Sequence, residues 1–191
     1  MNWFTLLPLG AFCVNLALLA FNFPKERPSK VFNAFLVIVI LSMAWELTDF
    51  LSWNQNIEAS LVLFLTRAQS PIWFALGFFY LNYVYQLLNK SRDVAYFFFL
   101  LMALLWVIST LTTDLVVVGQ QKTWWGNAVI VGDGYLPGVA FSGLAPFLFG
   151  FYLVLGQLNR TKDPTERTMY IWVILGQAVS SAAIFFINVV S

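Results

Sequence analysis

Long apolar runs alternate with short polar connections along the whole chain. Six runs reach about the 20 apolar residues that a helix needs to cross the hydrocarbon core of a bilayer. They occupy positions 3–23, 31–51, 61–88, 94–111, 136–158 and 168–190. No stretch shows the alternation of apolar and polar positions that is typical of an outer-membrane barrel strand. The pattern therefore predicts an all-α integral membrane protein, a bundle of six transmembrane helices that forms one domain over residues 1–191.

The third run, 61–88, is longer than a bilayer requires and contains Pro71. Two geometries stay open for it: the helix tilts, or its first turns, 61–66, lie in the interface. Proline is tolerated in the first turn of a helix and kinks a helix in its interior. We therefore expect Pro71 either near the start of this helix or at a bend.

Composition supports the membrane assignment, because 60% of the residues are apolar and only 10% are charged. Ordinary soluble domains carry about 45–50% apolar and about 25% charged residues. The net charge of +1 gives no electrostatic basis for nucleic-acid binding. With one cysteine, Cys13, and no histidine, neither an internal disulfide nor a metal site is expected, and any other cofactor stays unknown. The first run lacks a basic leader and a cleavage site, so we expect a retained helix.

The basic residues predict the orientation. Eight of the ten lysines and arginines lie in the connections 24–30, 89–93 and 159–167, which fall on one side of a six-helix zigzag. Only Arg67 and Lys122 lie on the other side. Excess Lys and Arg mark the cytoplasmic side of a membrane. We therefore expect a protein of the cell inner (plasma) membrane, with both termini outside and three short basic turns inside.

Ionisable residues within the apolar runs are few and gather near the outer side. Glu46 and Asp49 are three positions apart and so share one helix face. Arg67 lies near the outer end of the next helix, where an unpaired charge is costly. Because a short connection joins the two helices, we expect Arg67 to pair with Glu46 or Asp49, with Gln69 and Ser70 one turn deeper. Three uses stay open: an outward-facing ligand pocket, a structural ion pair, and plain interfacial exposure.

The outer connection 112–135 is the longest in the chain. Two short β-branched runs, 116–118 and 129–131, flank turn residues and suggest a small hairpin. Between them lie Trp124 and Trp125, each able to bury about 150–250 Å². These rings either rest in the interfacial aromatic belt or belong to a lid.

In the lid interpretation, the connection folds back over the outer end of the bundle. Trp124 or Trp125 then closes a cavity lined by Trp45, Glu46 and Arg67. The candidate ligand-binding residues are thus Trp45, Glu46, Asp49, Arg67, Gln69, Ser70, Trp124 and Trp125.

Other polar side chains within the runs are expected to hydrogen-bond between helices. They are Asn15, Asn82, Gln86, Gln177, Ser180, Ser181 and Asn188. The small residues Gly143, Gly150 and Gly156 predict close packing of the fifth helix. No phosphate-binding glycine loop, nucleophile elbow or histidine is present, so the chain itself is not expected to be an enzyme.

The order of several features resembles the seven-transmembrane amino-terminal sensor region of bacterial histidine kinases and related signalling proteins. The likeness covers essentially the whole chain. It rests on Pro24-Lys25-Glu26-Arg27-Pro28, Ala44-Trp45-Glu46-Leu47, Arg67 with Pro71, Trp125-Gly126 with Gly132, Thr161-Lys162-Asp163-Pro164-Thr165-Glu166-Arg167, and Leu175-Gly176.

The resemblance implies a sensor that binds a small, apolar or amphipathic ligand in its outer half. Ligand binding would shift the balance between two helix arrangements and signal to a cytoplasmic module. The family usually has a seventh helix before that module, whereas this sequence ends after the sixth run. The chain is then a fragment or split version of such a receptor, or an independent six-helix protein. The alternative function is a non-catalytic structural or transport subunit of a larger membrane complex. Expected partners are the lipid bilayer, a small-molecule ligand, and a second copy or other membrane subunits.

Overall fold

The computed structural model describes residues 6–22, 29–54, 56–123 and 126–190, with residues 22, 59, 177 and 179–190 described by their backbone alone. Each of the six apolar runs is helical, as predicted. The elements in chain order are α1 (Leu6–Asn22), α2 (Lys30–Ser52), α3 (Ala59–Leu87), α4 (Val94–Thr112), β1 (Val117–Lys122), β2 (Asn127–Val131), α5 (Tyr135–Gly138), the π-helix η2 (Val139–Leu144), α6 (Ala145–Leu158) and α7 (Pro164–Val190).

Four helical segments among the described residues are long and apolar enough to cross a membrane. They are α2, α3, α4 and the continuous segment Tyr135–Leu158 that comprises α5, η2 and α6. The apolar helix α1 is shorter, at 17 residues. The helical bundle is therefore suited to a bilayer, and four spans are supported by length and hydropathy.

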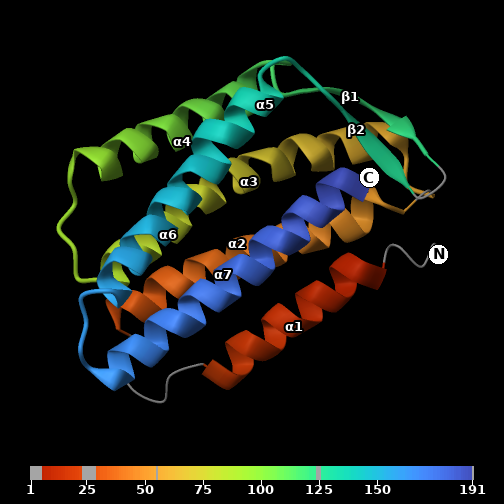
Figure 1. Ribbon diagram of the computed structural model, residues 1–191. Coiled ribbons are helices and arrows are strands. Elements are labelled where there is room, and N and C mark those ends of the chain that lie inside the picture. Colours follow the sequence, from red (N-terminus) through yellow and green to blue (C-terminus); the bar gives the residue numbers. More distant parts are fainter. Residues whose placement is uncertain (1–5, 23–28, 55, 124–125, 191) are drawn as a thin grey trace.

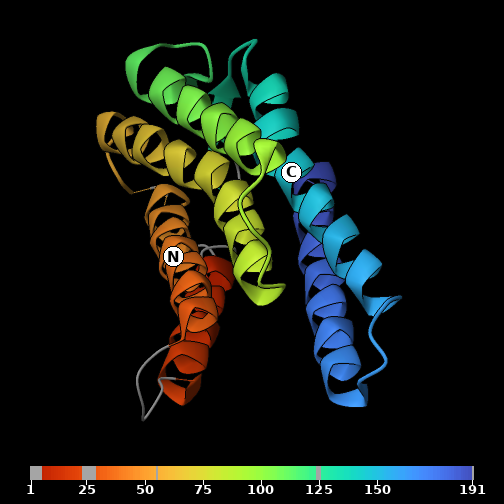
Figure 2. The same ribbon diagram turned by 90° about the vertical axis from the view of Figure 1, so that its left-hand side faces the viewer.

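Helix α3 is the central element of the bundle. It packs against α2, α4, α6, η2 and β1, whereas α1 packs on α2 and α7 packs on α6. Figure 1 labels the elements, and Figure 2 shows the pair α1–α2 and the pair α6–α7 on opposite sides of α3. Along α3, the side chains of Phe74, Leu81, Val84 and Tyr85 are at most 1% exposed. A helix that contacts neighbours on several sides must be apolar nearly all round, as α3 is.

Pro71 lies in the interior of α3 rather than in its first turn. It lacks the N–H that would bond the preceding turn, and its ring crowds that turn. The helix continues through it, and Figure 2 shows the axis of α3 turning partway along its length. The bend is therefore the geometry that the protein adopts.

The close contact between α3 and η2 depends on Gly77. A β-carbon at this position would lie 2.5 Å from the carbonyl oxygen of Gly143 and 2.9 Å from Cγ of Pro146. Ser142 lies in the same contact, fully buried, and its hydroxyl donates to the carbonyl of Gly138 at 2.8 Å. Only glycine permits the two backbones to approach this closely.

The connection between α4 and α5 runs back along the bundle, and its strand β1 packs on α3. Strands β1 and β2 pair antiparallel, with Lys122 opposite Asn127 and an irregularity between Val117 and Gly119. Val116 and Val117 are buried in a cluster with Phe74 of α3 and Trp106 of α4. The start of β1 therefore shares an apolar core with the helices, whereas the apolar side chains of β2 (Val129, Ile130 and Val131) are exposed.

A second contact joins the hairpin to α2. The buried side chain of Asn127 donates from Nδ2 to the carbonyl oxygen of Ser52 at 2.7 Å. Ser52 is the last residue of α2, so this bond satisfies one of the carbonyls that a helix end leaves without a partner.

Candidate functional site

The two carboxylates of α2 contact different neighbouring helices. Glu46 accepts a hydrogen bond at Oε1 from Nδ2 of Asn15 in α1, at 2.6 Å. Asp49 accepts one at Oδ1 from Nε2 of Gln69 in α3, at 2.5 Å. Both contacts are part-buried, and amide groups rather than cations provide the donors. One face of α2 thus ties α1 and α3 together through polar side chains.

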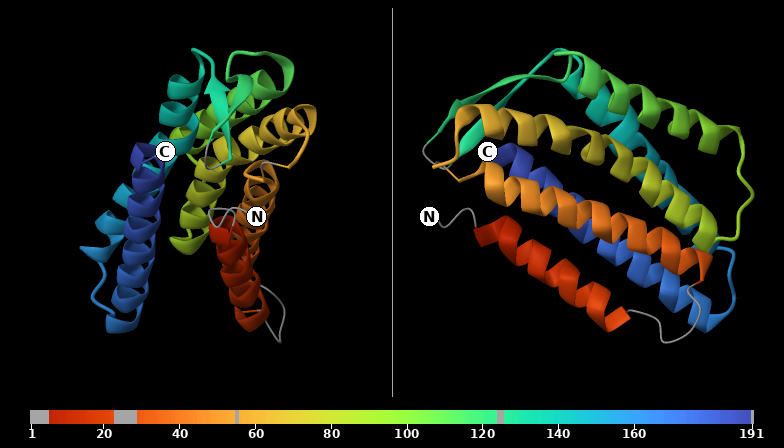
Figure 3. Two further views of the ribbon diagram at one scale, coloured as in Figure 1. Left: turned by 90° about the vertical axis from the view of Figure 1, so that its right-hand side faces the viewer. Right: turned by 180° about the vertical axis from the view of Figure 1, so that it is seen from behind.

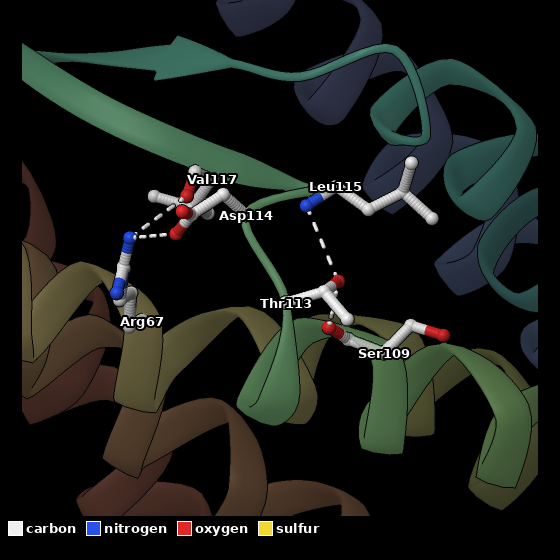
Figure 4. Close-up of polar contacts among 6 residues, drawn as sticks. All are labelled: Arg67, Ser109, Thr113, Asp114, Leu115 and Val117. Carbon is white, nitrogen blue, oxygen red and sulfur yellow. Dashed lines mark hydrogen bonds and ion pairs between the residues drawn. The ribbon is translucent and has the colours of Figure 1, made fainter.

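The predicted ion pair between Arg67 and Glu46 or Asp49 is wrong. Arg67 instead pairs with Asp114, and its Nη2 also donates to the carbonyl of Val117 at 3.4 Å (Figure 4). The physical reason is the folded-back connection, which brings Asp114 to Arg67 from a position 47 residues away in the chain. The carboxylates of α2 are meanwhile occupied by amides.

Asp114 is positioned by the end of α4. The hydroxyl of Thr113 donates to the carbonyl of Ser109 at 2.7 Å and accepts from the backbone N–H of Leu115 at 3.2 Å (Figure 4). These bonds fix the turn in which Asp114 lies, between α4 and β1. Sequence analysis missed Asp114 as the partner, although it is one of only two acidic residues in the connection 112–135.

The remaining described candidates are held by local contacts. Trp45 packs edge-on against Trp73, with 6.1 Å between ring centroids. Trp73 in turn stacks on Tyr135 at 6.3 Å. Ser70 donates to the carbonyl of Thr66 within its own helix, at 2.9 Å. Trp73 and Tyr135 were not singled out from the sequence, because their aromatic contact becomes visible only when α3 and α5 are placed together.

Trp124 and Trp125 lie outside the described residues, and so does the lid contact predicted for them. A cavity of about 490 Å³ does lie at the base of the hairpin. Asp114, Leu115, Val118 and residues 130–133 line it, whereas Trp45, Glu46 and Arg67 do not. The candidates on α2 and α3 are thus separate from this cavity.

Two of the candidate residues keep a buried polar atom without a hydrogen bond to any described residue. These atoms are the acceptor Oε2 of Glu46 and the donor Nε of Arg67. Buried polar atoms nearly always have a partner, and an unsatisfied one costs about 1–3 kcal/mol. Ser52 Oγ and Trp106 Nε1 are buried in the same way, so this feature is not confined to the candidate residues.

The structure does not bring the candidate residues together in one site. Glu46 and Asp49 contact α1 and α3, whereas Arg67 contacts Asp114 and the start of β1. In the ranges that the structure describes, no three His, Cys, Asp or Glu side chains gather as metal ligands. Comparison of the chain with protein-family models, with curated proteins and with solved structures gave no match.

Proposed function

We propose that this protein is the membrane-spanning part of a sensor, which binds a small amphipathic ligand among the outer halves of its helices. The bound state favours one helix arrangement and so signals to a cytoplasmic module. The role proposed for this chain is recognition rather than catalysis. The proposal includes the outside amino terminus predicted from the basic turns and a complex with a second copy or another membrane protein.

The observation that carries the proposal is the unpaired oxygen of Glu46. Its other oxygen is held by Asn15, so the carboxylate has a fixed orientation and a second, buried oxygen with no hydrogen bond from a described residue. A carboxylate in an apolar setting favours a cationic or hydrogen-bond-donating partner. An apolar tail on that partner would lie among the surrounding helices. The chemistry that fits is an amphipathic cation.

The contacts of α2 supply a route for the signal. Glu46 joins α2 to α1, and Asp49 joins α2 to α3. A ligand that competes with Asn15 for Glu46 weakens the first contact and leaves the second in place. A ligand shifts a conformational equilibrium only through such a difference in affinity between two states. Movement of α1 against α2 is therefore the proposed response.

The test uses octylamine as the probe, with the protein reconstituted in nanodiscs of zwitterionic lipid. Octylamine should raise the thermal unfolding midpoint of the wild-type protein, because it binds the folded state. Octanoate has the same chain length but an anionic head group, and it should have no effect. The variant Glu46→Gln should lose the response to octylamine.

Glu58→Gln is the matched control, since Glu58 is an exposed carboxylate just before α3. It removes the same charge near the same end of the bundle and should respond like the wild type. An equal response to octylamine in Glu46→Gln would refute the proposed site. A lost response in both variants would show that surface charge, not the Glu46 site, attracts the amine.

A further inference from the structure

A second polar site lies at the opposite end of the bundle from the hairpin. A cavity of about 590 Å³ opens between the start of α2, the end of α3 and the turn 88–93. Figure 3 shows this turn at the end of the molecule remote from β1 and β2. Lys30, Lys90 and Arg92 line the cavity, and none of the described acidic residues does. The cavity therefore concentrates positive charge.

Neutral donors complete the lining. Asn33 of α2, Asn82 and Gln86 of α3, and Ser91 of the turn all face the same space. The hydroxyl of Tyr96 donates to Oδ1 of Asn82 at 2.9 Å, so the amide oxygen is occupied. This leaves the Nδ2 group of Asn82 to donate, and no described residue accepts from it. The cavity is thus rich in donors as well as in charge.

Asp93, a carboxylate of the turn, forms its ion pair with Lys90 alone among the described residues. It also accepts from the hydroxyl of Tyr85 at 2.6 Å. These bonds, that from Lys90 foremost, hold the pKa of Asp93 well below its usual range, so Asp93 stays ionised. Lys30 and Arg92 form no ion pair with a described residue, and two positive charges remain for a ligand.

The turn that carries Lys90 and Arg92 is held in one conformation. Asn89 adopts a left-handed conformation, with φ 48°, and the N–H of Lys90 bonds to the carbonyl of Tyr85 at 2.9 Å. The guanidinium of Arg92 lies 5.1 Å from the ring centre of Tyr96. Preorganised cations lose less conformational entropy on binding than mobile surface lysines do. This distinguishes the cavity from an ordinary basic turn.

We infer that the cavity binds a phosphate group. Phosphate oxygens only accept hydrogen bonds at neutral pH, and Lys, Arg, amide and hydroxyl donors match them. Ala34 and Val37 extend the lining along α2 into the apolar part of the helix. A phosphate with an attached acyl chain, the head group of an anionic lipid, fits such a boundary position. A soluble phosphorylated molecule shares the same head-group chemistry.

The experiment compares lipid retention by native mass spectrometry of the purified chain. Phosphatidylglycerol and phosphatidylcholine are supplied in equal amounts, and glycerol 3-phosphate is titrated in a separate arm. The double variant Lys30→Gln with Arg92→Gln should weaken retention of phosphatidylglycerol about tenfold or more, because both charge-assisted contacts to the phosphate are lost. The double variant Arg160→Gln with Lys162→Gln removes the same charge at the same end but outside the cavity, and should weaken retention clearly less, because only the general surface attraction is lost.

Asn33→Leu removes a donor without changing the charge, and it should also weaken retention. This variant keeps the inference testable if the double variant at Lys30 and Arg92 fails to fold. Preference for phosphatidylglycerol without binding of glycerol 3-phosphate identifies a lipid as the source, and binding of glycerol 3-phosphate identifies a soluble one. Equal losses in both double variants, or no phosphate binding in either arm, would overturn the inference.

Discussion

Arg67 of α3 pairs with Asp114, which lies between α4 and β1, and so joins the central helix to the base of the hairpin. The same guanidinium reaches the carbonyl of Val117, the first residue of β1. The side chains of Arg67 and Asp114 are 40% and 71% exposed, so water screens the pair. Exposed ion pairs contribute only about 0–1 kcal/mol. The contact therefore positions the hairpin relative to α3 and adds little to the stability of the bundle.

The first prediction concerns Asp114→Asn. We expect this change to lower the free energy of unfolding by less than about 1 kcal/mol, because the pair is exposed. Amide hydrogen exchange in β1 should nevertheless accelerate, since the strand loses its link to α3. Asp133→Asn removes an exposed carboxylate of the same connection and should leave exchange unchanged. Equal exchange in both variants would contradict a positioning role for the pair.

Arg67 also shows how far the sequence determines the structure. Apolar runs locate the helices closely, because burying backbone groups in lipid requires helix formation. The run 94–111, for example, corresponds to α4 at Val94–Thr112. The partner of Arg67 depends instead on how a 24-residue connection folds back. No local pattern encodes that contact, since its partners are 47 positions apart.

Like the partner of Arg67, the contact of Gly77 with η2 could not be predicted from the sequence. Small residues were expected to pack the fifth helix, and Gly150 does so, since a β-carbon there would lie 2.7 Å from Cε1 of Tyr80. The expectation is wrong for Gly156, where a β-carbon would meet nothing within 4 Å. Gly77 belongs to a run of large apolar residues and gave no such signal. Gly77 matters because it lies against the π-helix η2, whose backbone carbonyl at Gly143 would be too close to a β-carbon at this position.

The second prediction is that Gly77→Ala destabilises the protein by about 1–3 kcal/mol, the usual range for overpacking. The added methyl group must push η2 away from α3, since backbone atoms rather than flexible side-chain ends stand in its way. Thermal unfolding in nanodiscs measures the effect. Gly156→Ala is the control, because a β-carbon there meets nothing within 4 Å. If Gly77→Ala is as stable as Gly156→Ala, then α3 and η2 can move apart without loss of stability, which would contradict the prediction.

The third prediction is a pH dependence that arises from Asp93. Hydrogen bonds from Lys90 and Tyr85 lower the pKa of Asp93 below its unfolded value. The stabilisation is therefore fully present above the unfolded pKa of about 3.9, and is lost as the pH falls through the lower folded pKa. Unfolding midpoints of the wild type and Asp93→Asn should differ by a constant amount at neutral pH.

Below about pH 4 this difference should shrink, because Asp93 takes up a proton in the unfolded chain before it does so in the folded protein. Asparagine is the suitable replacement, since it still caps α4 by accepting from the N–H of Tyr96. The comparison thus isolates the charge of Asp93 from its role as a cap. A difference that grows toward acid pH would contradict the sign of the shift.

The last prediction concerns orientation, on which the proposed sensor role depends. In a protein whose Cys13 is replaced by alanine, single cysteines are introduced as Ser91→Cys and Thr161→Cys in the basic turns, and as Asn56→Cys and Gln121→Cys at the other end. A membrane-impermeant maleimide added to spheroplasts should label the second pair and not the first, because basic turns stay in the cytoplasm. Detergent should make all four reactive, which controls for local burial. The reverse pattern would place Glu46 near the cytoplasm and the basic cavity outside. An extracellular ligand could then not reach Glu46 as proposed, whereas the phosphate site would face the outer leaflet and its lipid preference would still be measurable.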